Sequence, residues 1–319
     1  MSTDTNTEQT GESASDESGG CTATSGSTAD SGGCTAGSGS ADSGDGSRSD
    51  TGSTKRQSVE EKIDATIEEF DADPGTLTAV GLGPGHPEGM TQRARAALLS
   101  ADHIVGYTTY IDLLPEAVTE AADELYDTPM CGEVSRTEEA IDRALSGHDV
   151  AIIGSGDPNV YALSGLALEI LESKGATASM VDYEVVPGVP AAQSCSALLG
   201  APLVNDTVSI SLSDHLVPML EIESRLHAAA GESFTIVLYN PWSRKRRDNF
   251  AKCCEILLAH RGPDTPVGIV HGAGRDDEET LITTLGELEA LGESDIIDMT
   301  TTILVGNAET YVWDDRMVT

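Results

Sequence analysis

The chain has 319 residues, a formal net charge of −36 at pH 7, a pI near 4.2 and only 4% aromatic residues. This charge disfavours nucleic acids and anionic lipids as partners, because like charges repel at long range. No apolar run approaches the length of about 18 residues that spans a membrane, and no signal peptide is recognisable, so we expect a cytoplasmic protein. The acid excess with few lysines is typical of a halophilic protein, in which salt screens self-repulsion.

Residues 1–54 consist mostly of Ser, Gly, Thr, Ala and Asp, and Arg48 is their only basic residue. A segment with so few apolar side chains cannot bury enough surface to offset the entropy of ordering, so we predict a disordered acidic tail. Cys21 and Cys34 occupy the same place in a near repeat within this tail. Two thiolates are too few for a closed metal site, and we predict no bound metal.

The rest of the chain predicts an α/β protein with two lobes, each a sheet flanked by helices. Residues 55–75 place apolar side chains at helical spacing, which predicts an amphipathic lead-in helix. Residues 76–187 alternate strands with helices, which indicates an N-terminal lobe on a parallel sheet. Residues 188–319 contain more closely spaced strands, which indicates a C-terminal lobe with a mixed sheet, and we expect the ligand cleft between the lobes. The expected strands are 76–83, 103–107, 149–156, 183–188, 207–214, 234–240, 266–272, 279–285 and 301–306, and the expected helices are 92–101, 137–147, 160–173, 190–200, 222–230 and 249–260.

The first candidate ligand loop is the glycine-rich turn VGLGPGHPEGMT, residues 80–91, which follows a predicted strand. Gly81, Gly83 and Gly85 allow a ligand to approach the backbone closely. Pro84 lies among these glycines and removes an N–H donor, so the turn fits a nucleotide phosphate poorly. The turn is therefore either structural or a wall for another kind of ligand.

Two further loops follow later strands. In IIGSGDPNVYALSG, residues 152–165, Asp157 precedes a proline, where a carboxylate fits either a helix cap or a contact with a ribose hydroxyl or a cationic sulfonium. In VVPGVPAAQSCSALLG, residues 185–200, a helix starts with Ala191 and Ala192. These small residues leave room either for a flat ring or for close packing of the chain.

In this order the three loops resemble those of the tetrapyrrole methylase family, from about Leu77 to the carboxyl terminus. Within the family, the chain is similar to the branch that methylates precorrin-3B or its cobalt-containing counterpart at carbon 17 in cobalamin biosynthesis. The narrower resemblance rests on the segments VGYTTYIDLL (105–114), CGEVSRTEEAI (131–141), SGDPNVYA (155–162), SISLSDHLVPMLEIESRL (209–226) and LYNPWSRKRR (238–247).

The resemblance implies a two-lobed class III methyltransferase, a homodimer, with S-adenosyl-L-methionine bound in the cleft. It implies an enzyme that methylates a small-molecule corrin precursor at carbon 17 and contracts the ring, with or without cobalt in the substrate. Alternatives that stay open are methylation of another precorrin carbon, 11 or 20, and a diphthine-type methylase. A protein that binds S-adenosyl-L-methionine without catalysis is a further alternative.

Carried over motif by motif, the resemblance assigns cofactor contacts to the three loops and to loops after later strands. Family members usually carry an acid at the position of His86, so the chain departs from the family pattern there. The residues expected to contact the cofactor are Gly81, Gly83, Pro84, Gly85, Ser155, Gly156, Asp157, Tyr161, Pro190, Ala191, Tyr239, Asn240, Ala273 and Thr302.

Methyl transfer from a sulfonium requires in-line positioning and exclusion of water rather than a nucleophilic side chain. Ring contraction nevertheless implies proton transfers near the new carbon–carbon bond. The candidate proton-transfer residues on predicted cleft loops are His86, Tyr107, Tyr110, Asp157 and Asp214.

The densest basic cluster of the chain directly follows the segment YNPWS. It lies at a predicted helix start, where each cation opposes the helix dipole at a cost of about 0.3 to 1 kcal/mol. We expect Arg244, Lys245 and Arg247 to bind carboxylates of the substrate. The alternative is a solvated surface run that neighbouring acids balance.

Overall fold

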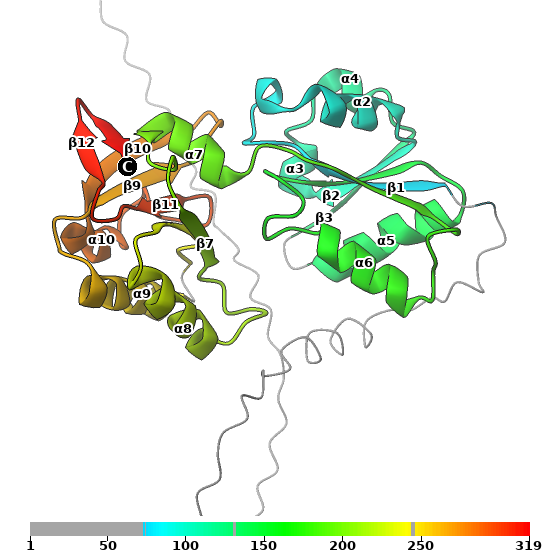
Figure 1. The fold of residues 1–319 in the computed structure, drawn as a ribbon. Helices are drawn as coiled ribbons and strands as arrows, with labels where there is room; N and C mark the ends of the chain where they lie inside the picture. The colour runs from blue at the N-terminus through cyan, green and yellow to red at the C-terminus, as the bar shows by residue number, and fades with distance from the viewer. Residues whose placement is uncertain (1–72, 74, 130–131, 244–245) are drawn as a thin grey trace, which may run out of the picture. The chain divides into compact units, whose positions relative to one another are not determined.

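The computed structural model describes residue 73 and residues 75–129, 132–243 and 246–319, which belong to one unit, Ser49–Thr319 (Figure 1). The predicted acidic tail, nearly all of the predicted lead-in helix, and the side chains of Arg244 and Lys245 lie outside these residues. Within the described ranges, no helix is both long and apolar enough to cross a membrane.

The first sheet has five parallel strands, as the alternation of strands and helices predicts. Its central strands are buried almost throughout, because helices cover both faces. Gly81 pairs with Gly154, so β1 and β4 end at the same level and their following loops emerge side by side. In order across the sheet the strands are β3 (Glu124–Thr128), β2 (His103–Tyr107), β4 (Val150–Gly154), β1 (Thr76–Gly81) and β5 (Asp182–Val186).

Alternate residues of these strands face two separate cores. On one face, Val80, Ile104 and Ile153 pack against α2 and α4 (Figure 1). On the other face, Leu77 and Ile152 pack against α5 and α6. The helices of this part are α2 (Gln92–Ser100), α3 (Thr108–Ile111), α4 (Glu116–Thr119), α5 (Glu133–Leu145) and α6 (Ser164–Ser173).

The second sheet is mixed, as predicted: β7 and β8 are parallel, and the other neighbours are antiparallel. α8 (Met219–Ala230), α9 (Arg247–His260) and α10 (Leu285–Leu291) cover one face, and α7 (Ala191–Leu199) covers the other (Figure 1). In order across the sheet the strands are β10 (Glu279–Thr284), β9 (Pro266–His271), β11 (Thr302–Val305), β8 (Thr235–Tyr239) and β7 (Thr207–Ser211).

Several elements were not predicted from the hydrophobic pattern. β3 is an edge strand whose sequence ELYDT is mostly exposed or half-buried, so it offers no continuous apolar run. β12 (Tyr311–Trp313) and β13 (Arg316–Val318) form a hairpin that adds to β6 (Gly200–Ala201). This hairpin turns through Asp314 and Asp315, whose positive φ angles of 47° and 60° suit a two-residue turn.

Candidate active site

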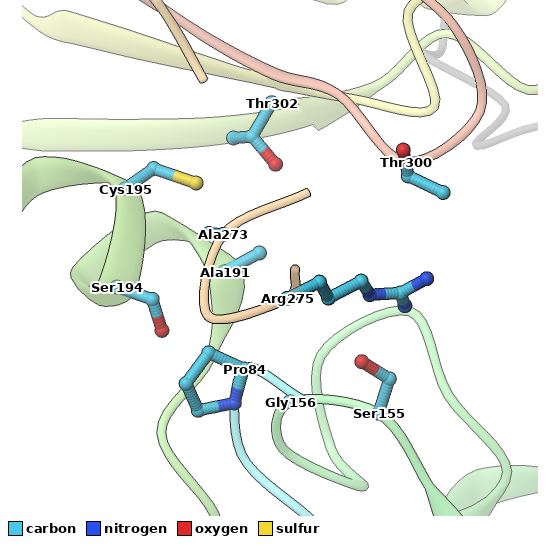
Figure 2. Close-up of a pocket in the computed structure, with 10 residues that line it drawn as sticks. All are labelled: Pro84, Ser155, Gly156, Ala191, Ser194, Cys195, Ala273, Arg275, Thr300 and Thr302. Carbon is cyan, nitrogen blue, oxygen red and sulfur yellow. The ribbon is translucent and has the colours of Figure 1, made fainter. Parts of the chain in front are cut away.

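A small pocket, with a cavity volume of about 60 Å³, opens among loops that adjoin the strands of both sheets (Figure 2). This volume is below the range of about 300 to 1,000 Å³ that is typical of small-molecule sites. Small residues dominate the wall, and Arg275 is the only charged residue among the described residues that line it. The lining comprises Pro84 after β1, Ser155 and Gly156 after β4, Ala191, Ser194 and Cys195 of α7, Ala273 and Arg275 after β9, and Thr300 and Thr302 at the start of β11.

One wall of the pocket is built from backbone, where the loops after β1, β4 and β5 meet. Gly83 and Gly156 exchange two backbone hydrogen bonds, with N···O distances of 3.1 and 2.8 Å. A Cβ atom on Gly188 would lie 2.1 Å from the carbonyl oxygen of Gly156, and one on Gly81 would lie 2.6 Å from the same oxygen. Both positions therefore require glycine, because neither neighbour is a side chain that could rotate away.

Pro84 connects the turn after β1 with the loop after β9. Its ring lies against both Gly89 and Gly274, since a Cβ atom on either glycine would come within 2.9 Å of it. A Cβ atom on Gly85 would lie equally close, at 2.9 Å, to the side chain of Arg275. The glycine turn is thus fixed by contacts within the protein, and Pro84 is its residue that lines the pocket.

Six of the fourteen predicted cofactor contacts line this pocket, and the other eight are not among its lining residues. Pro190 is the residue before α7, and its Cα lies 3.5 Å from the position of a Cβ on Gly156. The glycines of the turn pack on backbone or on Arg275, and their contact with a ligand stays a prediction. The six lining residues are Pro84, Ser155, Gly156, Ala191, Ala273 and Thr302.

Asp157 ties two of the pocket loops together. Its Oδ1 accepts a hydrogen bond from the N–H of Asn159 at 2.9 Å, and its Oδ2 accepts one from the N–H of Gly188 at 3.2 Å. The alternative expectation of a helix cap is wrong, because α6 begins only at Ser164 and is preceded by Leu163. The carboxylate therefore orders the backbone, and its oxygens retain lone pairs for a further donor.

Tyr239, the last residue of β8, contacts the start of α7. Its hydroxyl accepts a hydrogen bond from the N–H of Ala192 at 2.9 Å, which leaves the hydroxyl proton for another acceptor. Burial raises the pKa of Tyr239, so the hydroxyl remains protonated. The Tyr161 ring centroid lies 5.0 Å from that of Tyr239.

Tyr161 and Asn240 have positive φ angles of 52° and 49°, a conformation that non-glycine residues adopt mainly at functional sites and turns.

Four lining residues were missed by the sequence analysis. One is Cys195, which lies beside Thr302 and is 1% exposed. Burial raises the pKa of its thiol to about 11, so the sulfur is neutral at pH 7 and is a poor nucleophile. The pocket joins segments far apart in the chain, so no local motif marks them. The four missed residues are Ser194, Cys195, Arg275 and Thr300.

Tyr107 and Tyr110, two predicted proton-transfer residues, lie together where β2 ends. Their ring centroids are 5.3 Å apart and the ring planes are at 89°. The guanidinium of Arg136 lies 5.9 Å from the Tyr107 ring centroid and donates to Thr128 Oγ1 at 2.5 Å. Burial raises the pKa of Tyr110, and the nearby cations Arg275 and Arg136 oppose that change.

None of the five predicted proton-transfer residues is among the described residues that line the pocket, and two of them, His86 and Asp214, lie on the surface. His86 is exposed, and its Nδ1 accepts a hydrogen bond from the N–H of Glu88 at 3.2 Å at the start of the short 3₁₀ helix η2 (Pro87–Gly89). Asp214 is exposed and lies near Arg246: burial lowers the pKa of Arg246, and Asp214 opposes that change. The structure thus gives each of these side chains a local partner.

Arg247 begins α9, which agrees with the predicted helix start. Its guanidinium lies 3.4 Å from a carboxylate oxygen of Glu293 and 5.6 Å from the ring centroid of Trp242. This arrangement fits the alternative of a surface run balanced by acids, and Arg247 is absent from the pocket lining. Substrate binding by Arg247 stays a prediction.

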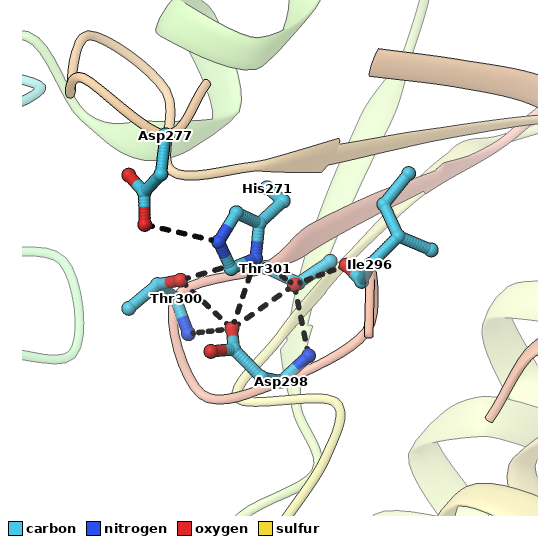
Figure 3. A network of polar contacts seen from close by, with 6 residues as sticks. All are labelled: His271, Asp277, Ile296, Asp298, Thr300 and Thr301. Atoms are coloured by element: carbon cyan, nitrogen blue, oxygen red, sulfur yellow. Dashed lines mark hydrogen bonds and ion pairs between the residues drawn. The ribbon is translucent and has the colours of Figure 1, made fainter. Parts of the chain in front are cut away.

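A polar network around His271 joins two of the loops that line the pocket (Figure 3). His271 ends β9, and its two ring nitrogens lie 3.3 Å from carboxylate oxygens of Asp277 and Asp298. Asp298 also accepts a hydrogen bond from the N–H of Thr300 at 2.7 Å. The network therefore holds the loop that carries Ala273 and Arg275 against the loop that carries Thr300 and Thr302.

Comparisons with known proteins agree on one family. The model of the Tetrapyrrole (Corrin/Porphyrin) Methylases matches residues 76–289. The cobalt-factor III methyltransferase of Priestia megaterium is 45% identical over 77% of the chain, which spans only 44% of that longer protein. The probable cobalt-factor III C(17)-methyltransferase of Salmonella typhimurium is 40% identical over 76% of the chain and 97% of its own length. The crystal structure of the methyltransferase CobJ is 32% identical, with a TM-score of 0.69 over 77% of this chain and 99% of that one.

Proposed function

Because the chain belongs to the tetrapyrrole methylase family, we propose that it transfers a methyl group from S-adenosyl-L-methionine to carbon 17 of a corrin precursor and contracts the ring. The observation that carries this proposal is the 40% identity to the Salmonella typhimurium relative over 97% of that protein's length. The Sinorhizobium precorrin-3B C(17)-methyltransferase, 35% identical over 91% of its length, supports the same ring carbon. Both relatives favour carbon 17 over carbons 11 and 20.

The composition of the pocket fits this cofactor. A wall of backbone and small side chains at Gly156, Ala191 and Ala273 can accommodate an adenine ring and a thioether chain. The lining offers no run of phosphate-binding lysines, and Pro84 removes a donor that a phosphate would need. When bound, S-adenosyl-L-methionine supplies an electrophilic methyl group. The protein's own part is to hold this group in line with the ring carbon and to exclude water.

The proton transfers of ring contraction fall to side chains near the pocket. Asp157 is the candidate that we retain first, because it directly follows the lining residue Gly156 and its oxygens keep lone pairs for a further donor. Tyr110 is the second candidate, because the charge of the lining residue Arg275 acts on it. Tyr107 supports Tyr110 by edge-to-face contact. His86 and Asp214 rank lower, because both are exposed outside the lining.

The proposal is tested by turnover with methyl-labelled S-adenosyl-L-methionine. Purified full-length protein is incubated with cobalt-containing precursor and, separately, with metal-free precursor, and label is followed into the macrocycle. We expect label in at least one product. The preferred substrate shows whether cobalt is inserted into the ring before this methylation. Cofactor binding without label in either product would favour a non-catalytic binding protein instead.

Replacing His271 with alanine is expected to weaken binding of S-adenosyl-L-homocysteine about tenfold. The substitution removes the contacts that hold two lining loops together. We expect this to make the free energy of ligand binding less favourable by about 1 to 2 kcal/mol. Isothermal titration calorimetry measures the affinity, and His271→Gln, which keeps a donor and an acceptor, should lose less. Equal affinity in wild type and His271→Ala would show that the network does not position the loops.

We also propose that the protein is a cytoplasmic, salt-adapted homodimer. The net charge of −36 supports salt adaptation, because molar salt reduces the Debye length to about 3 Å. The homodimer is supported only by the family resemblance. Light scattering in molar potassium chloride would give the mass of the particle, and a monomer there would contradict this part of the proposal.

A further inference from the structure

Arg275 supplies a positive charge to the pocket of a strongly acidic protein. It is the only charged residue among the described residues of the lining, while the whole chain carries a net charge of −36. Figure 2 shows its side chain extending along the pocket wall, with Ser155 on one side and Thr300 on the other. A cation at this place gives the pocket a local positive potential, which attracts an anionic ligand although the protein as a whole is acidic.

Two acids that follow Arg275 in the sequence have partners within their own loop. Asp277 faces His271 at 3.3 Å, and Glu278 accepts a hydrogen bond from the N–H of Gly274 at 2.7 Å. Among the described residues, no acid forms an ion pair with Arg275, in contrast to Arg247 and its partner Glu293. The Arg275 guanidinium therefore keeps its donors for a ligand.

A second cation, Arg136, is buried beside Tyr107. Arg136 is only 4% exposed, and its Nε has no hydrogen-bond acceptor among the described residues. Its guanidinium lies 5.9 Å from the Tyr107 ring centroid, and the Tyr107 ring meets that of Tyr110 at 5.3 Å. The charges of Arg275 and Arg136 both act to lower the pKa of Tyr110. The carboxylate of Glu133, 3.7 Å from Arg136 Nη2, offsets part of the charge of Arg136, so Arg275 is the cation that faces the pocket.

We infer that Arg275 binds a carboxylate of the ligand at the edge of the pocket. The planar guanidinium forms two parallel hydrogen bonds with a carboxylate, which a lysine cannot reproduce. The inference rests on the proposed function, because a corrin precursor carries many carboxylates and S-adenosyl-L-methionine carries one. The carboxylate-binding cation of the pocket thus lies on the loop after β9 rather than at the start of α9.

The test measures binding, without turnover, of two ligands to full-length wild type and to Arg275→Gln. The first ligand is uroporphyrin III, an octacarboxylic tetrapyrrole whose absorbance reports binding. The second is S-adenosyl-L-homocysteine, compared with 5′-methylthioadenosine, which lacks the carboxylate. We expect Arg275→Gln to bind uroporphyrin about tenfold or more weakly, and Arg275→Lys to recover only part of that loss. If the carboxylate is instead that of the cofactor, the loss appears with S-adenosyl-L-homocysteine and not with 5′-methylthioadenosine.

Arg95→Gln serves as the matched control. Arg95 is exposed on α2, lies outside the pocket lining, and its loss changes the net charge by the same amount. All proteins are compared in one buffer of fixed high salt, so a general field effect would appear equally in both variants. Unchanged binding of both ligands by Arg275→Gln overturns this inference and leaves the proposed function in place. Wild-type protein that binds neither ligand would overturn the proposed function and this inference together.

Discussion

Replacing Gly188 with alanine is expected to reduce the affinity for S-adenosyl-L-homocysteine by about 100-fold. The new Cβ would lie 2.1 Å from the carbonyl oxygen of Gly156 and 2.8 Å from that of Gly81. Relief would require the loops after β1, β4 and β5 to separate, which breaks the hydrogen bonds between Gly83 and Gly156. Overpacking costs about 1 to 3 kcal/mol, and each 1.4 kcal/mol is a factor of ten in affinity.

Calorimetry with the Gly188→Ala protein checks this expectation, and circular dichroism confirms that the variant is folded. Gly165→Ala is the control, because a Cβ on Gly165 meets nothing within 4 Å and the residue lies in α6. That variant should bind as wild type does and gain up to about 1 kcal/mol in stability from helix propensity. If the two alanine variants bound S-adenosyl-L-homocysteine equally well, the backbone wall would not be part of the cofactor site.

Replacing Arg261 with methionine is expected to lower the free energy of unfolding by about 3 to 5 kcal/mol. The guanidinium is half-buried. It donates hydrogen bonds to carbonyl oxygens at the end of α8, in the turn before β8 and at the end of β11. One of these joins Nη2 to the carbonyl oxygen of Phe234 at 2.8 Å. Removal of the donors takes one hydrogen-bond donor from each of these carbonyl groups, most of which are partly buried. The acceptors are Ala229, Ala230, Glu232, Phe234, Val305 and Gly306.

Urea unfolding in molar salt, followed by circular dichroism, measures the loss for Arg261→Met. Arg225→Met removes an arginine whose ion pair with Glu221 is exposed on α8, and it should cost no more than about 0.5 kcal/mol. A loss at Arg261 as small as that at Arg225 would mean that solvent replaces the lost donors. The comparison separates a buried hydrogen-bonding centre from an ordinary surface charge.

The sheets were predictable where burial makes the sequence regular. β1 and β4 are nearly continuous apolar runs, because helices cover both faces of a parallel sheet. β3 escaped prediction because an edge strand with exposed acids resembles a loop. The hairpin of β12 and β13 escaped because each strand has only three residues, too few to show a periodic pattern, although Tyr311–Trp313 consists of strand-forming residues.

The candidate site was predictable where one loop carries its own signal. Pro84 and Gly156 stand in motifs that follow strands, and the structure places both on the pocket lining. Arg275 gave no such signal, because its position depends on the packing of its loop against Gly85, far away in the sequence. The cluster at Arg247 drew the substrate prediction because charge is visible in a sequence, whereas its partner Glu293 is visible only in the structure.

Nuclear magnetic resonance shows most directly which carbon of the macrocycle receives the methyl group. Wild-type protein is given S-adenosyl-L-methionine with a carbon-13 methyl group and a precursor at the precorrin-3B level. We predict a product with one new labelled methyl group on carbon 17 and a contracted ring. A label on any other carbon, or a product in which the ring is methylated but not contracted, would contradict the assignment.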